Sequence, residues 1–158
     1  MNLRRILLIT TLIVGTGAIA SNTDQKNDAK YKVLRESMTH AFNDGDSARF
    51  YTHLTNLQNY LLEQGDLHGY YTQRCNDIIF EMNRQKIFEA YTKAAQLSKE
   101  LREKKLDKEM YMAVNMMGHI NKYCGNKEAA KKCWYEVIDM MEKNGYYESI
   151  PPIYMNII

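Results

Sequence analysis

The chain has 158 residues, of which 45% are hydrophobic and 25% are charged, a balance that excludes an intrinsically disordered chain. Only 2 Pro and 8 Gly are present, and this scarcity favours long helices over a turn-rich β fold. The formal net charge is only +2, from 21 basic and 19 acidic residues, and a chain so close to neutral does not have the basic surplus of a nucleic-acid-binding domain.

The N-terminal segment differs in composition from the rest of the chain. Arg4 and Arg5 form a short basic start, and residues 6–20 form an uncharged run that ends in an A-x-A pattern at residues 18–20. A basic start, an apolar run and small residues at a cleavage point are the three parts of a secretory signal peptide. The sequence therefore predicts a signal peptide over residues 1–20.

Cleavage after Ala20 places the mature protein outside the cytoplasm, in the periplasm or cell envelope, and leaves a polar leader over residues 21–28. The signal removes two basic residues and no acidic one, so 19 basic residues then balance 19 acidic ones, and nucleic acid is not an expected partner. The alternative is an uncleaved membrane anchor, but a span requires about 20 apolar residues and this run is shorter. We expect membrane attachment only through sequence downstream of residue 158.

From residue 29 onward, apolar residues recur three and four positions apart, which predicts helices throughout. Gly, Asn and Asp residues interrupt the pattern at intervals and mark turns and helix caps. The expected helices span residues 29–43, 46–64, 67–83, 86–104, 107–124 and 126–143, and a seventh begins near Ser149.

Apolar residues also repeat at a 40-residue spacing. Four sets share one helix face, because their relative offsets are 0, 4, 7 and 11, and three tyrosines add a fifth set. Five sets in register indicate an internal repeat, whose unit is a helical hairpin that must stack on its neighbours to bury its apolar face. The sets are Phe50, Ala90 and Ala130; Leu54, Ala94 and Trp134; Leu57, Leu97 and Val137; Leu61, Leu101 and Met141; and Tyr31, Tyr71 and Tyr111.

The stretch from residue 117 to residue 137 resembles the tetratricopeptide repeat. An aliphatic residue and Gly stand in the first helix, Gly-Asn stands at the turn, and Ala precedes an aromatic by four positions in the second helix. Asn121 departs from the family pattern, which has Tyr there, and the 40-residue period exceeds the family's 34. The expected structural core of this repeat consists of Met117, Gly118, Gly125, Ala130, Trp134 and Val137.

The resemblance implies an all-α fold, a right-handed α-solenoid of about three and a half stacked hairpins over residues 29–158. The hairpins would span residues 29–64, 67–104 and 107–143, with a partial fourth at 146–158. In this family the first helices line a concave surface that binds an extended peptide or a protein. The residues expected on that partner-binding face are Met112, Asn115, His119 and Lys122 of the third hairpin and Thr72, Cys75, Ile79 and Met82 of the second.

The C-terminal segment begins like a helix at Ser149, since the two prolines that follow are tolerated in a first helical turn. Residues 153–158 then form an apolar face that ends on two isoleucines. A terminal repeat needs a polar outer face for solubility. We therefore expect further repeats or a partner to cover this end, as in a fragment of a longer array.

Residues with catalytic or ligating potential do not assemble into a recognisable pattern. His40, His53, His68 and His119 lack the spacing of zinc ligands, and no phosphate-binding loop or nucleophile motif is present. We therefore predict no enzyme activity, no metal and no cofactor.

The cysteines Cys75, Cys124 and Cys133 are interpreted as small buried apolar residues. A bond between Cys124 and Cys133 would have to span about 10 Å, given the helical rise between them. Bridged Cα atoms lie no more than about 7 Å apart. The sequence therefore argues against that disulfide.

Taken together, these features predict a non-enzymatic protein-interaction or sensing module. The export signal and the composition are similar to those of periplasmic repeat regions of membrane-bound regulators in Bacteroidota-type bacteria, where a signalling domain follows the array. The alternative is an envelope adaptor or an assembly or chaperone-like factor that binds peptides or protein partners. A catalytic domain hidden in the helices finds no support in any site pattern.

Overall fold

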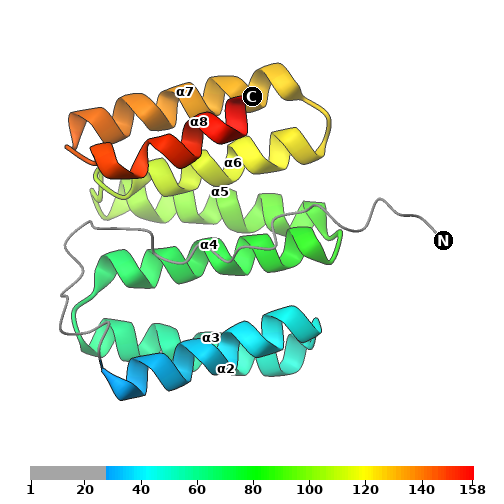
Figure 1. The fold of residues 1–158 in the computed structure, drawn as a ribbon, viewed down its shortest axis with the longest axis vertical. Helices are drawn as coiled ribbons and strands as arrows, with labels where there is room; N and C mark the ends of the chain where they lie inside the picture. Colours follow the sequence, from blue (N-terminus) through cyan, green and yellow to red (C-terminus); the bar gives the residue numbers. More distant parts are fainter. Residues whose placement is uncertain (1–27) are drawn as a thin grey trace. The chain divides into compact units, whose positions relative to one another are not determined.

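The computed structural model describes residues 28–158, and every regular element in that range is helical (Figure 1). The all-α prediction is confirmed at this level. The predicted signal peptide and the polar leader up to residue 27 lie outside the described residues. The elements are α2 (Ala29–Asp44), α3 (Ser47–Glu63), α4 (Leu67–Asn83), α5 (Ile87–Glu103), α6 (Met110–Tyr123), α7 (Lys127–Lys143), the short 3₁₀ helix η2 (Tyr147–Ser149) and α8 (Pro151–Ile157).

Contacts divide the described residues into two compact units, and the boundary along the chain falls within α4, between Arg74 and Cys75. In the first unit, α2 packs against α3 as a helical hairpin. In the second unit, α6 packs against both α5 and α7, and α8 packs against α7 (Figure 1). Helices adjacent in sequence are therefore packed in pairs, as expected where short connections join them.

Six connections between helices share one backbone geometry. Each contains a single residue with a positive φ, between 55° and 82°, and these residues are spaced 20 positions apart. In each connection, the next residue donates its N–H to the carbonyl five positions earlier, as Asp46 does to Ala41 and Tyr146 does to Met141. This hydrogen bond and a left-handed residue define the Schellman ending of a helix. The left-handed residues are Gly45, Gly65, Gln85, Lys105, Gly125 and Gly145.

Two of these six positions do not hold glycine, and this predicts a stability gain. A left-handed conformation costs a non-glycine residue about 1–2 kcal/mol, part of which is offset because glycine has more freedom in the unfolded chain. We expect Gln85→Gly and Lys105→Gly each to raise the free energy of unfolding by about 0.5–1 kcal/mol. Urea unfolding followed by circular dichroism measures the change. The reverse substitution, Gly125→Ala, should lower stability, and a loss of stability in both glycine variants would contradict the proposed strain.

One predicted boundary is wrong, because α6 begins at Met110 and not at Asp107. The N–H groups of Glu109 and Met110 donate to the carbonyls of Leu106 and Asp107, respectively, at 3.2 and 3.3 Å, so tight three-residue turns precede the helix. The connections at which an aspartate caps a helix behave differently. The Asp46 carboxylate accepts a hydrogen bond from the Arg49 N–H at 3.0 Å, in the ordinary N-cap arrangement.

The apolar residues of the 40-residue repeat form the interior. All members of the four apolar sets on the second helices are at most 4% exposed. Tyr71 and Tyr111 of the tyrosine set are also buried, whereas Tyr31 is half-buried. The repeated face in the sequence is therefore the buried face of α3, α5 and α7, as amphipathic helices require.

The last helix buries one side and exposes the other. Ile150 and Ile153 are buried, whereas Tyr154 is 49% exposed, Met155 71% and Ile158 99%. No charged side chain is present from Ser149 to Ile158. The expectation that repeats or a partner cover this face stays a prediction.

Candidate functional site

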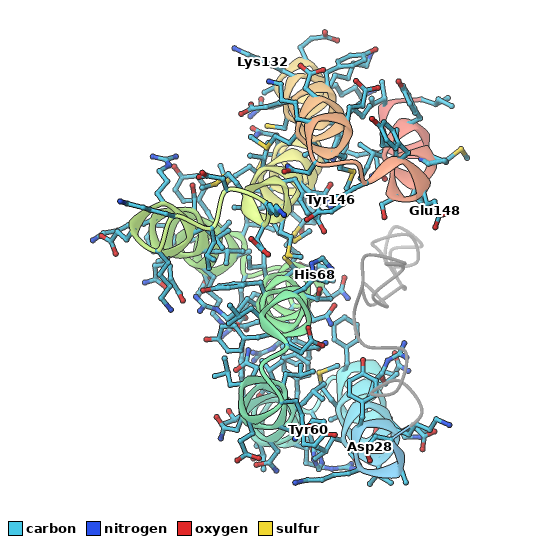
Figure 2. The ribbon with its side chains drawn as sticks, turned by 90° about the vertical axis from the view of Figure 1, so that its left-hand side faces the viewer. Asp28, Tyr60, His68, Lys132, Tyr146 and Glu148 are labelled. Carbon is cyan, nitrogen blue, oxygen red and sulfur yellow. The ribbon has the colours of Figure 1, made fainter. Side chains whose placement is uncertain are left out.

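The structure buries five of the eight residues predicted to contact a partner. Thr72, Cys75, Ile79, Met82 and Met112 are each at most 5% exposed, which contradicts their assignment to an open concave face. The Thr72 hydroxyl is satisfied locally, because it donates to the backbone carbonyl of His68, labelled in Figure 2, at 2.9 Å. The other four are apolar or weakly polar side chains that pack in the interior, where they exclude water.

The remaining three predicted residues surround the indole of Trp134 on α7. The Trp134 Nε1–H donates to Asn115 Oδ1 at 3.1 Å. The His119 ring meets the indole edge-to-face with centroids 5.5 Å apart, and Lys122 Nζ lies 5.3 Å from the indole centroid. Asn115, His119 and Lys122 can reach one side chain because offsets of four and three place them on one face of α6. We call these four residues the Trp134 cluster.

Gly118 explains how Trp134 fits against α6. A Cβ atom placed on Gly118 would lie 2.6 Å from Trp134 Nε1 and 2.9 Å from Cε2, closer than real contacts allow. The indole therefore packs directly on the bare backbone at Gly118, and Trp134 is only 1% exposed. Among the other residues expected in this repeat's core, Ala130 and Val137 are buried, Met117 is half-buried, and Gly125 supplies the left-handed turn.

The surroundings of the imidazole change the protonation of His119. Desolvation, with a smaller contribution from the Lys122 ammonium, lowers the pKa of His119 to about 4. The imidazole is therefore neutral at neutral pH. Lys122 Nζ also donates to the backbone carbonyl of Asn156 in α8 at 3.4 Å, which links the cluster to the last helix. The cluster combines an aromatic ring, a cation and neutral hydrogen-bonding groups, which suits packing and recognition better than proton transfer.

The lowered pKa of His119 predicts a loss of stability in mild acid. The unfolded chain binds a proton near pH 6.5 while the folded chain does so only near pH 4. Stability is therefore full above pH 6.5 and declines as the pH falls toward 4. Allowing for partial exposure, we expect the free energy of unfolding to be about 1–2 kcal/mol lower at pH 5 than at pH 7 through this group.

The measurement is urea unfolding of wild type and His119→Gln at both pH values. The variant should lose less stability than wild type between pH 7 and pH 5, because it lacks the titrating group. His40→Gln, at an exposed histidine, is the matched control and should lose as much as wild type. Equal pH dependence in wild type and His119→Gln would contradict this assignment.

Sequence reasoning missed an ion-pair network between α4 and α5. Lys93 Nζ lies 2.5 Å from Asp77 Oδ1 and 3.1 Å from Glu81 Oε1, and Arg84 Nη1 lies 3.6 Å from Glu81 Oε2. The Glu81 side chain is only 7% exposed. The sequence does contain a signal for this network, because Glu81 lies 40 residues after Ala41 and so places a charged residue where the first repeat has an apolar one. Apolar periodicity alone does not detect such a position.

Buried polar groups concentrate in α4. Over residues 28–158, every buried polar or charged residue belongs to this helix: Thr72, Gln73, Asn76 and Glu81. Buried polar groups are retained where hydrogen bonds or ion pairs satisfy them. They restrict how α4 can pack, because a rotated or shifted helix would break those interactions.

No disulfide joins Cys75, Cys124 and Cys133, and one of the three departs from its interpretation. Cys75 is buried as expected, Cys133 is half-buried, and Cys124 is exposed because it lies in the turn after α6. Desolvation, with a smaller contribution from Glu136, raises the pKa of Cys133, so its thiol is protonated at neutral pH.

Within residues 28–158, no three His, Cys, Asp or Glu side chains gather in a way that could hold a metal ion. None of the helices in this range is both long enough and apolar enough to cross a membrane.

Comparison with protein-family models, curated proteins and solved structures finds no match to this chain.

Proposed function

We propose that the chain is a non-enzymatic protein-interaction or sensing module, built as an array of helical hairpins of the tetratricopeptide type. One observation carries the proposal, namely the recurrence of the same left-handed helix ending every 20 residues from Gly45 to Gly145. Identical turns between helices of 14 to 17 residues favour identical hairpins, apart from the short last helix. Hairpins of one geometry stack into an extended scaffold.

Such a scaffold supports binding because its outward positions can vary while its inner positions hold the fold. The buried residues of α3, α5 and α7 repeat in this chain, whereas their exposed residues do not: Phe88, for example, corresponds to Ala48 and Glu128. Variation confined to the surface is what partner recognition requires. The polar groups of the Trp134 cluster fit the same role, since they hold two helices together without assembling a nucleophile and a base.

We place the module outside the cytoplasm, as the periplasmic part of a longer regulator. The apolar run at residues 6–20 and its A-x-A end support export. The uncharged, partly exposed α8 supports a covering repeat or partner at this end. Alkaline phosphatase fused after residue 143 should be active in cells, and deletion of residues 1–20 should abolish that activity. Activity that survives the deletion contradicts the export assignment.

Site-specific photo-crosslinking tests the interaction role. A photoreactive phenylalanine analogue is placed at Tyr91, Tyr135 or Tyr154, each about half exposed, and the protein is irradiated in cells of its native host. A binding module should give a discrete adduct at some of these positions and none at the others, because a partner covers only part of the surface. Adducts at none of them, or the same diffuse adducts at all of them, would contradict the proposal.

A further inference from the structure

Two aromatic side chains are exposed at the start of α5. Phe88 is 79% exposed and Tyr91 49%, and their three-residue separation places them on one face of the helix. Large aromatic residues contribute strongly to interfaces when a partner covers them. Neither belongs to the buried sets of the 40-residue repeat, so the packing of the repeat does not require them.

A shallow groove continues this face along α5. It has a volume of about 490 Å³. Its lining combines the apolar Ala94, Ala95 and Met117 with the polar or charged Ser98, Lys99, Arg102 and Glu103. Ala95 lies four residues after Tyr91, so the aromatic pair and the groove share one side of the helix. The volume falls within the range of sites that hold a few side chains of a ligand. We call Phe88, Tyr91, Ala95 and Arg102 the α5 outer face.

The charged lining of the groove has a net positive charge, because Lys99 and Arg102 outnumber Glu103. Arg102 Nη2 donates to Ser98 Oγ at 3.2 Å, and no carboxylate in the described part of the chain forms an ion pair with Arg102. The neighbouring Lys99 already has an acidic partner, because its Nζ lies 3.7 Å from Glu103 Oε1. An arginine without an acidic partner beside an apolar groove is suited to a carboxylate from another molecule.

The repeat supplies an internal comparison. The positions of α7 that correspond to Phe88, Tyr91, Ala95, Lys99 and Arg102 carry mixed charges and a single exposed tyrosine, as on an ordinary solvated helix. The combination of exposed aromatics, small residues and an arginine is therefore particular to α5 and not a property of the hairpin. The corresponding residues are Glu128, Lys131, Tyr135, Asp139 and Glu142.

We propose that the α5 outer face is the docking surface for a peptide segment of a partner protein that carries a large apolar residue near an acidic one. The apolar side chain seats over Ala95 beside Tyr91 and Phe88, and the carboxylate pairs with Arg102. An anionic membrane fits less well, because acidic residues are interspersed among the basic ones at the end of α5. Residues 99–108 contain five basic and three acidic side chains. This inference rests on the proposed interaction role and names the surface and the partner chemistry.

The test is a phage-display selection of random 12-residue peptides on the immobilised protein, followed by fluorescence anisotropy of the enriched peptides. The peptides should share an Asp or Glu within four positions of a large apolar residue. Arg102→Glu, Ala95→Gln and Phe88→Ser should each weaken binding at least tenfold. Tyr135→Ser, which removes an aromatic that is 54% exposed on α7, should change binding less than twofold. Replacing the peptide's acidic residue by Lys should restore binding to Arg102→Glu.

Circular dichroism establishes that each variant folds, as expected because Phe88, Ala95 and Arg102 are exposed. Enriched peptides that are insensitive to all three α5 substitutions overturn this inference but leave the interaction role standing. An empty selection also overturns it, and the crosslinking experiment then decides the interaction role separately. Binding to phosphatidylglycerol vesicles that Arg102→Glu abolishes, with no acidic peptide enriched, would replace the peptide by a membrane surface.

Discussion

Replacing Trp134 by alanine will lower the free energy of unfolding by about 3–5 kcal/mol, the range for truncating a large aromatic in a core. The side chain is 1% exposed and packs on the backbone of Gly118. Its removal also leaves Asn115 Oδ1 without the indole N–H that it accepts. Urea unfolding followed at 222 nm measures the loss, since Trp134 is the only tryptophan and its fluorescence disappears with it.

The neighbouring Tyr135→Ala is the matched control, because Tyr135 is 54% exposed and its truncation should cost less than about 0.5 kcal/mol. A Trp134 variant no less stable than this control would contradict the packing of α6 on α7 described above.

Gly118→Ala sharpens the test through a double-mutant cycle. In wild type the added Cβ meets the indole at 2.6 Å and should destabilise by about 1–3 kcal/mol through overpacking. In the Trp134→Ala background the space is open, and the higher helix propensity of alanine should stabilise by up to about 1 kcal/mol. The sign of the Gly118→Ala effect should therefore reverse between the two backgrounds. Equal effects in both would show that Gly118 and Trp134 are not in contact.

Local sequence signals were sufficient for the helices and for their buried faces. Apolar periodicity predicted the helix ranges to within about three residues, and it identified the residues that fill the cores of α3, α5 and α7. It could not identify the turns at Gln85 and Lys105 as equivalent to the glycine turns, because the left-handed backbone there is imposed by the flanking helices. The sequence predicts a left-handed turn residue only where that residue is one, such as glycine, that favours a positive φ.

The candidate site could not be predicted in the same way. Which side of α6 faces solvent depends on what packs against it, and Asn115, His119 and Lys122 turn toward Trp134. Tertiary packing also decides whether the equivalent residues of the preceding repeat are exposed. Ile79 and Met82, which lie 40 residues before His119 and Lys122, are buried. The Lys93 network arises from side chains 12 and 16 residues apart, and no periodic pattern of apolar residues reports such pairs.

Lys93→Met should lower the free energy of unfolding by about 3 kcal/mol at pH 7. This value is the lower end of the range for breaking a buried ion pair. Methionine keeps most of the apolar stem but removes the ammonium that both Asp77 and Glu81 contact. Two carboxylates, 17% and 7% exposed, are then left without their shared cation, and the partial exposure of Lys93 itself, 28%, moderates the cost. Urea unfolding followed by circular dichroism measures the change.

The source of that cost can be separated from loss of packing. If loss of the Lys93 charge beside the two carboxylates causes it, the triple variant Asp77→Asn, Glu81→Gln and Lys93→Met should recover most of the stability. Replacing buried ion pairs by neutral groups is often nearly neutral, and Arg84, which then loses Glu81, is 30% exposed and keeps contact with solvent. Lys99→Met is the matched control: Lys99 pairs with Glu103 at 3.7 Å, both side chains are more than 60% exposed, and such a surface pair contributes at most about 1 kcal/mol. A triple variant no more stable than Lys93→Met would assign the loss to packing and not to charge.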